Sequence, residues 1–286
     1  MKDLLSFITA MLIFGTIGIL RRFIPLSSAV IAFFRGILGS LFLLVFLKFK
    51  RSPLTLPDTQ DIIKLALSGA FLGINWLFLF EAYNFTSVPI ATLFCYTNPA
   101  IVIILSAIFL GERLTARKCL CLMLSLTGML LISGVIESGL PGQDDIKGIL
   151  CALASASLYA SVVIMNKRVK GAEIYAKTII QLSASALVMV PYIIFTSGFA
   201  SGEWNAASLA LLLYAGIVNT GIAYVLYFGS MNGLSAGTIA FFSYIDPVTA
   251  LILAAVILGE SLTLTGLAGA ALILASSVIS ELAKNS

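Results

Sequence analysis

Few residues of this chain could do chemistry, because most of its charged side chains lie outside its long apolar runs. The exceptions include Arg35 in one run, and Asp246 in another, directly before Pro247. Ionisable side chains inside a membrane are costly and by default mark a functional position. The chain has no histidine, so it lacks the usual general base, proton relay and metal ligand. Any proton coupling must therefore use a carboxylate, and Asp246 is the leading candidate.

The stretch around Asp246 is one of two copies of the same unit. Residues 94–115 read FCYTNPAIVIILSAIFLGERLT, and residues 242–263 read FSYIDPVTALILAAVILGESLT, at a constant offset of 148. Eleven of the 22 paired positions are identical. Chance similarity between apolar segments would not keep an aromatic residue, a proline and a Gly-Glu pair in one register. The sequence therefore indicates an internal duplication.

The composition is that of a polytopic membrane protein. Of the 286 residues, 60% are hydrophobic and 10% are charged, whereas a soluble protein carries about 25% charged residues. A membrane-spanning helix needs about 20 apolar residues. Ten segments qualify: 4–24, 28–48, 61–83, 87–110, 115–136, 146–166, 174–197, 207–230, 235–258 and 263–283. The first of them lacks a cleavage-site pattern and is expected to be a span, not a signal peptide.

The distribution of Lys and Arg predicts the orientation of these spans. Thirteen of the 17 basic residues fall on the N-terminal side of the membrane, and three fall on the other side. Because cytoplasmic loops are rich in Lys and Arg, both termini are expected in the cytoplasm. Two units, 1–138 and 144–286, then hold five spans each. An odd number inverts the second unit relative to the first, an all-α architecture found in many secondary transporters.

The two Pro-containing spans predict a shared central cavity. Pro99 and Pro247 each remove a backbone hydrogen bond and bend a helix, and each follows a polar residue, Asn98 or Asp246. Arg35 would hold a carboxylate in this cavity, either that of a substrate or that of Asp246. The alternatives are bends that serve packing only, and an Arg35 that extends to the interface or forms a fixed ion pair.

Further candidates for substrate binding are aromatic and amide side chains at similar depth. Tyr96 and Tyr244 lie two residues before the polar-Pro pairs, and aromatic rings stack on substrates or cations. The other candidates are Asn75, Trp76, Tyr159, Tyr224 and Gln181, which corresponds to Arg35 when a gap is allowed. Most aromatic residues of so apolar a chain must nevertheless face lipid or the core.

The Leu-Gly-Glu-x-Leu-Thr end of each copy is typical of a helix boundary. Gly111 permits a left-handed C-cap, Thr115 is a natural N-cap of the next helix, and Glu112 is expected to accept hydrogen bonds from that helix start. Gly259, Thr263 and Glu260 are expected to play the same parts in the second copy. Alternatively, the two glutamates help to gate access to the transporter from the two sides of the membrane. Small residues such as Gly128 and Gly269 predict either close helix packing or a homodimer contact.

These features together resemble one known family. The chain resembles the EamA-type family of the drug/metabolite transporter superfamily in three features. They are ten expected spans in a five-plus-five duplication, an Arg in the second span (Ala32-Phe33-Phe34-Arg35-Gly36) and the paired aromatic-x-Asn/Asp-Pro block. The resemblance covers nearly the whole chain. It implies a carrier of the bacterial inner membrane for amino acids, other metabolites or drug-like compounds, often in the outward direction, without naming a substrate.

We therefore expect a secondary transporter with a small-molecule substrate, without cofactor, metal or nucleic-acid partner. An uncoupled facilitator or exchanger and a channel stay open as alternatives, although no filter-like loop is visible. A membrane enzyme is disfavoured, because there is no histidine and Asp246 pairs by the repeat with Asn98. No phosphate-binding Gly-x-x-x-x-Gly-Lys motif is present, which argues against direct use of ATP. One Arg and one Asp at depth would suit a zwitterion such as an amino acid.

Overall fold

The computed structural model describes residues 2–138, 141–169, 171–196, 198–199, 202–259 and 263–282, without the side chains of residues 22, 137, 138, 281 and 282. Secondary structure in these ranges is helical, apart from an isolated antiparallel bridge between Leu26 and Gly202. Eight helices in this part of the chain are long and apolar enough to cross a membrane. The protein is therefore a multi-pass membrane protein.

The eight candidate spans are built from one or more helical elements each. They are Lys2–Arg21, Ser28–Phe49, Thr59–Phe85, Val88–Leu110, Gln143–Arg168, Ile174–Phe195, Ala206–Gly233 and Ala236–Leu258. The elements, in chain order, are α1 (Lys2–Phe14), α2 (Ile17–Phe23), α3 (Ser28–Phe49), α4 (Thr59–Phe85), α5 (Val88–Cys95), α6 (Asn98–Leu110), α7 (Ala116–Ile132), α8 (Val135–Ser138), η1 (Gln143–Asp145), α9 (Ile146–Arg168), α10 (Ile174–Phe195), α11 (Ala206–Gly216), η2 (Ile217–Ile222), α12 (Ala223–Ser230), η3 (Met231–Gly233), α13 (Ala236–Ser243), α14 (Ile245–Leu258) and α15 (Leu264–Leu282).

The remaining two expected spans, 115–136 and 263–283, contain the helices α7 and α15, which lie against each other. Helix α7 has 17 residues and is separated from α8 by a turn at Gly134. The hydroxyls of Ser125 and Ser276 meet at 2.6 Å between the two helices. A methyl group added to Gly128 would lie 2.7 Å from the carbonyl oxygen of Gly269. The small residues of this pair therefore serve close packing within the chain, and a homodimer stays a prediction.

Several helices are interrupted in mid-course. The chain breaks between α5 and α6 beside Pro99, and between α13 and α14 beside Pro247, the two positions at which bends were expected. Two further interruptions were not expected. One separates α1 from α2 at Gly15 and Thr16, and the other is η2, a π-helical turn inside the span that α11 and α12 form. All four lie well inside their candidate spans.

The expected caps at the ends of α6 and α14 are formed. Gly111 and Gly259 have left-handed backbone angles, with φ of 70° and 68°. The hydroxyl of Thr115 accepts from the N–H of Lys118 at the start of α7, and Thr263 does the same for Gly266 in α15. The two copies of the repeated unit thus end in the same local geometry.

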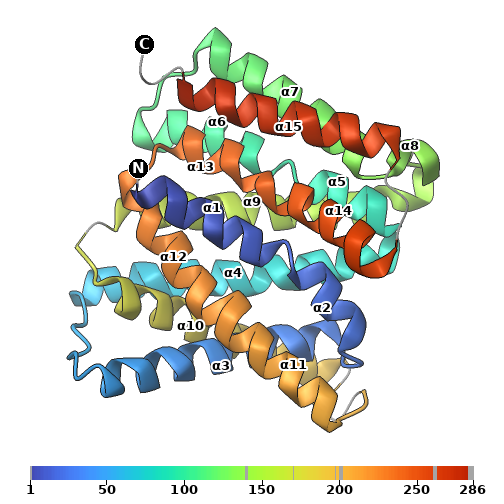
Figure 1. Ribbon diagram of the computed structural model, residues 1–286. Coiled ribbons are helices and arrows are strands. Elements are labelled where there is room, and N and C mark those ends of the chain that lie inside the picture. The colour runs from blue at the N-terminus through green and yellow to red at the C-terminus, as the bar shows by residue number, and fades with distance from the viewer. Residues whose placement is uncertain are drawn as a thin grey trace.

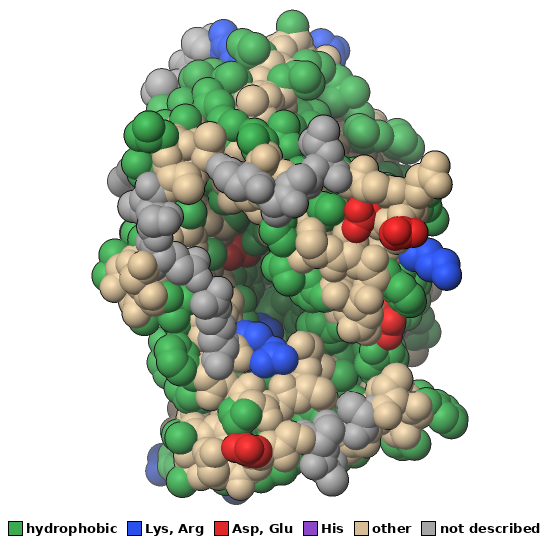
Figure 2. Space-filling view, turned by 90° about the vertical axis from the view of Figure 1, so that its right-hand side faces the viewer, with side chains coloured by type: hydrophobic (Ala, Val, Ile, Leu, Met, Phe, Trp, Pro, Cys, Tyr) green, Lys and Arg blue, Asp and Glu red, His purple; other side chains and the backbone are tan. Residues whose placement is uncertain are grey.

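The long helices run roughly parallel or antiparallel to one another, so the molecule has two ends at which the helices begin and end (Figure 1). Helix α1 begins at the end where α13 also begins, and α2 ends at the opposite end, where α5 begins. Figure 2 views the latter end and shows a hollow, with an acidic side chain deep inside it and basic side chains at its edge. We call this end the open end, and the end where α1 and α13 begin the closed end.

The α7–α15 contact leads to a test of packing. Gly128→Ala should lower the free energy of unfolding by about 1–3 kcal/mol, because the added methyl group overpacks against the backbone of α15. Thermal unfolding of the purified protein in detergent measures this change. Gly18→Ala in α2 is the matched control, since nothing lies within 4 Å of the added methyl group. Equal melting temperatures for the two variants would contradict the packing described here.

Candidate functional site

The interruptions of two spans meet around Asp246. Tyr96, at the break between α5 and α6, donates its hydroxyl to a carboxylate oxygen of Asp246 over 3.1 Å. Tyr244, at the break between α13 and α14, donates its hydroxyl to the backbone carbonyl of Tyr96 over 3.0 Å. The break leaves that carbonyl without a hydrogen-bond partner in its own helix. Lipid could not supply a donor, so the hydroxyl of Tyr244 satisfies the carbonyl instead. The structure therefore brings three predicted residues, Tyr96, Tyr244 and Asp246, into one hydrogen-bonded cluster.

Arg35 lies in a second group. Its Nε donates to the hydroxyl of Thr220 over 3.0 Å, and its guanidinium lies 5.5 Å from the ring centroid of Trp76. Neither Arg35 nor Asp246 forms an ion pair with a described side chain. The predicted alternative of a fixed Arg35–Asp246 pair is thus not formed. A half-buried guanidinium and a half-buried carboxylate near mid-span instead keep capacity for a ligand.

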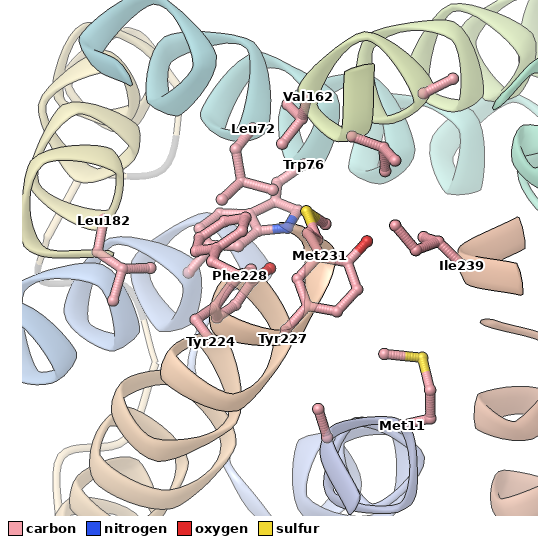
Figure 3. Packing of buried hydrophobic residues seen from close by; sticks show 14 of the residues in the cluster. Met11, Leu72, Trp76, Val162, Leu182, Tyr224, Tyr227, Phe228, Met231 and Ile239 are labelled. Atoms are coloured by element: carbon pink, nitrogen blue, oxygen red, sulfur yellow. The ribbon is translucent and has the colours of Figure 1, made fainter. Parts of the chain in front are cut away.

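Aromatic side chains pack together beside Arg35, and Figure 3 shows three of them, Trp76, Tyr224 and Tyr227. Tyr159 donates its hydroxyl to that of Tyr227 over 2.6 Å, and the ring of Tyr227 meets that of Tyr224 edge to face at 6.1 Å. Phe14, at the end of α1, packs on Tyr224 with ring centroids 5.0 Å apart. The predicted residues Trp76, Tyr159 and Tyr224 therefore belong to one aromatic cluster beside the charged residues.

Two predicted residues have a different setting. Gln181 is fully buried, accepts from the hydroxyl of Ser68 over 2.8 Å and exchanges hydrogen bonds with the amide of Asn166. The amide of Asn75 donates to both the carbonyl and the hydroxyl of Ser155. These bonds join α4 to α9 and α10, so in this conformation both side chains hold helices together instead of facing a ligand. Asn98 is half-buried and makes no side-chain hydrogen bond with the described residues.

A packed apolar cluster separates these groups from the closed end. Figure 3 shows side chains from α1, α4, α9, α12, η3 and α13 converging in it. Phe7, Met11, Phe228, Met231 and Ile239 are all buried there, with at most 2% of each side chain exposed. Such a layer leaves no room for a hydrated solute. The molecule is therefore sealed toward the closed end, whereas its open end carries the hollow of Figure 2.

At the closed end, charged side chains hold helix ends together. Glu112 accepts from the backbone N–H of Ala236 over 2.7 Å and from the ammonium of Lys118 over 3.1 Å. Glu112 was expected to accept hydrogen bonds from the start of the helix after it. It does so from the side chain of Lys118 in the first turn of α7, but its backbone donor belongs to the start of α13, which was not expected. Burial alone would raise the pKa of Glu112, but these hydrogen bonds outweigh it and lower the pKa. Its counterpart Glu260 lies outside the described residues.

Two basic side chains complete this closed-end network. The ammonium of Lys167 donates to the backbone carbonyls of Met231 and Leu234, on either side of the turn that leads into α13. Arg168 donates to the carbonyl of Phe109 near the end of α6 over 3.0 Å. Cations at helix C-termini and an anion at a helix N-terminus follow the helix dipole. The turn between α12 and α13 is therefore tied to α6, α7 and α9.

Two separate cavities lie away from Arg35 and Asp246. One of about 480 Å³ is lined at the closed end by residues of α7 and α13, among them Arg117, Lys118 and Thr238. The other, of about 310 Å³, is lined at the open end by residues that include Ser27, Asn84 and Tyr192. Neither cavity is lined by Arg35, by Asp246 or by a tyrosine predicted from the sequence to bind substrate.

Sequence reasoning missed the residues on η2 that contact this site. Thr220 holds Arg35, and the neighbouring Asn219 donates its amide to the carbonyl of Ile13 and to the hydroxyl of Thr16 at the break in α1. The available signal was a polar pair, Asn219-Thr220, between Gly216 and Gly221 within an otherwise apolar run. Its importance depends on a helix-helix contact that the local sequence does not reveal.

Comparisons with known proteins agree with this architecture. The uncharacterized transporter YxxF of Bacillus subtilis is 29% identical over 258 residues, which are 89% of this chain and 81% of YxxF. Protein RarD of Salmonella typhi is 31% identical over 208 residues, 72% of this chain and 67% of RarD. A crystal structure of another protein shares the fold, with a TM-score of 0.84 and 20% sequence identity over 98% of each chain.

The family model gives the most direct assignment. The sequence model of the EamA-like transporter family matches residues 1–134 and again residues 146–281. The two matches together cover nearly the whole sequence. The helical fold with its candidate membrane spans fits that description. The chain belongs to the EamA-like transporter family and is a multi-pass membrane transporter.

Proposed function

We propose that this transporter is a secondary carrier of small metabolites in the bacterial inner membrane. Its substrates are amino acids or related compounds, and it exports them from the cell. It works by alternating access, in which a central site opens to one side of the membrane at a time. The observation that carries the proposal is the position of Arg35 and Asp246. Both are half-buried inside their candidate spans without an ion pair among the described side chains, and a packed apolar cluster lies between them and the closed end.

The proposal includes ten spans in two inverted five-helix units, 1–138 and 144–286, with both termini in the cytoplasm. The α7–α15 pair supplies the fifth and tenth spans. Two repeated features support the duplication. A helix break occurs at both Tyr96 and Tyr244, and a left-handed C-cap occurs at both Gly111 and Gly259. In this orientation the open end faces away from the cytoplasm, and the closed-end network of Glu112, Lys167 and Arg168 lies on the cytoplasmic side.

A substrate with a carboxylate and an amino group fits the two charges. The carboxylate would bind Arg35, since a guanidinium recognises two oxygens at once, and the ammonium group would lie near Asp246 and the tyrosine rings. An uncoupled facilitator or exchanger is the second candidate, because the same site would serve it equally. The two differ in their response to a proton gradient.

Counterflow in proteoliposomes tests the proposal. Purified protein is reconstituted with an excess of one unlabelled amino acid inside, and uptake of the same labelled amino acid is followed across a panel, with and without a pH gradient. Saturable exchange of a panel member would support a carrier, and stimulation by the gradient would support coupling to protons. A conductance without saturable exchange would replace the carrier by a channel.

Asp246→Asn should abolish stimulation of transport by the pH gradient, and counterflow at zero gradient should remain measurable but need a higher substrate concentration, because the charge near the substrate ammonium is lost. The substitution keeps the hydrogen bond from Tyr96 but removes the titratable carboxyl group. Glu81→Gln is the matched control, because Glu81 also accepts a tyrosine hydroxyl, that of Tyr192, but lies near the end of α4. If Asp246→Asn and the control are stimulated alike, Asp246 is not the proton site.

Glu112→Ala should loosen the closed end. Losing the charge-assisted bond from the start of α13, worth about 1.5–3 kcal/mol, should raise the rate at which a cysteine placed at Ile239 is labelled by at least about tenfold. The reporter is placed in a variant whose four native cysteines are replaced by alanine, and an impermeant maleimide is added to inside-out vesicles. Because the pKa of Glu112 is lowered, its stabilising effect persists at neutral pH and is lost only as the pH falls through that lowered value.

Asp61→Ala is the control for the closed-end network. Asp61 pairs with Lys64 at 2.7 Å at the same end of the molecule, but both belong to the first turns of α4 and tie no other helix. Labelling at position 239 should therefore stay at the parental rate in this variant. An equal effect of Asp61→Ala and Glu112→Ala would show that general charge loss, and not the tie to α13, controls access.

A further inference from the structure

The π-helical turn η2 is an unusual element at the centre of the molecule. Turns of this kind are rare, cost hydrogen-bond geometry and are frequent at functional sites. Helix α3, which carries Arg35, crosses η2 closely: a methyl group added to Gly39 would lie 3.2 Å from both Gly216 O and Gly221 N. The segment that corresponds to η2 at the offset of 148 lies in α4, which is an uninterrupted α-helix. The turn is thus a feature of the second half alone.

Thr220 on this turn fixes one edge of Arg35. Its hydroxyl donates to the carbonyl of Ala215 over 2.9 Å, so its oxygen is left to accept the Nε–H of Arg35. The ring of Trp76 lies against the guanidinium. The two terminal nitrogens of Arg35 have no hydrogen bond to a described residue, and they form the edge that matches the two oxygens of a carboxylate.

Asn219, the preceding residue, fixes the break in α1. Its amide nitrogen donates to Ile13 O over 2.7 Å and to the Thr16 hydroxyl over 2.6 Å. Between these two residues, Gly15 packs on the start of α14, where an added methyl group would lie 2.8 Å from the backbone oxygen of Asp246. The side-chain oxygen of Asn219 is buried without a partner among the described residues, which leaves an acceptor for a water molecule or a substrate N–H.

We propose that η2 is the positioning element of the substrate site and sets it for a small molecule with a carboxylate. Adjacent residues of one turn hold the two charged groups: Thr220 holds Arg35 directly, and Asn219 holds the α1 break against the backbone of Asp246. A shift of η2 therefore moves the cationic and anionic parts of the site together. This inference rests on the proposed function for its ligand class, but the positioning role has a readout of its own.

The fluorescence of Trp76 provides that readout. The chain has two tryptophans, and Trp204→Phe leaves Trp76 alone beside Arg35. In this background Thr220→Val should shift the emission of Trp76, because the guanidinium is released from its partner, while Thr220→Ser should keep the parental spectrum. Thr178→Val is the matched control, since Thr178 is a buried threonine whose hydroxyl bonds only its own helix. A spectrum unchanged in Thr220→Val, or changed equally in Thr220→Ser, overturns the positioning role.

Ligand titration of the same full-length proteins tests the substrate class. The probes are L-norleucine and n-pentylamine, which differ by the carboxylate. Thr220→Val should weaken norleucine binding about tenfold, the effect of one charge-assisted hydrogen bond, and leave pentylamine binding unchanged. Equal weakening of both, or parental binding of norleucine, overturns the inference. If the parent protein does not bind norleucine, the proposed ligand class is refuted, but the positioning role is not. If no panel compound shows counterflow, the proposed function is refuted, and the fluorescence result still decides the positioning role.

Discussion

Lipid cannot bond the backbone groups that a broken helix exposes, so every mid-membrane break needs a partner within the protein. This constraint organises the centre of the molecule. The carbonyl of Tyr96 takes the hydroxyl of Tyr244, and the carbonyl of Ile13 takes the hydroxyl of Thr16 and the amide of Asn219. Two of these partners come from other spans. The breaks therefore hold one another in place, and polar side chains gather where they meet.

The same need for partners explains the chemistry of the closed end. Lys167 and Arg168 donate to carbonyls at the ends of other helices, and Glu112 accepts from the first N–H of α13. Each charge has the sign that the helix dipole favours at that position. Basic residues that predict membrane topology thus also tie separate helices together. Opening this end requires that several of these bonds be exchanged for bonds to water, which is feasible at an interface and not in the apolar interior.

The parts of this structure that follow from sequence are those with a local cause. Proline lacks a backbone N–H in any context, so breaks beside Pro99 and Pro247 were predictable, and so were the tyrosines next to them. The partner of Glu112 was not, because it depends on which helix start lies nearby in space. The burial of Gln181 and the π-turn at Thr220 have the same origin: contacts between helices that are distant in the sequence decide both.

The difference between the two halves gives the site a direction. Gln181 carries both donors and an acceptor, and Ser68, Asn166 and the carbonyl of Lys177 satisfy it inside the protein. A guanidinium has five donors and no acceptor, and Thr220 engages one of them in Arg35. Asp246 in turn corresponds to the neutral Asn98. One half thus supplies a cation and the other an anion. In the substrate site that we propose, two identical halves would bind either end of a ligand equally, whereas this pair would distinguish a carboxylate end from an amino end.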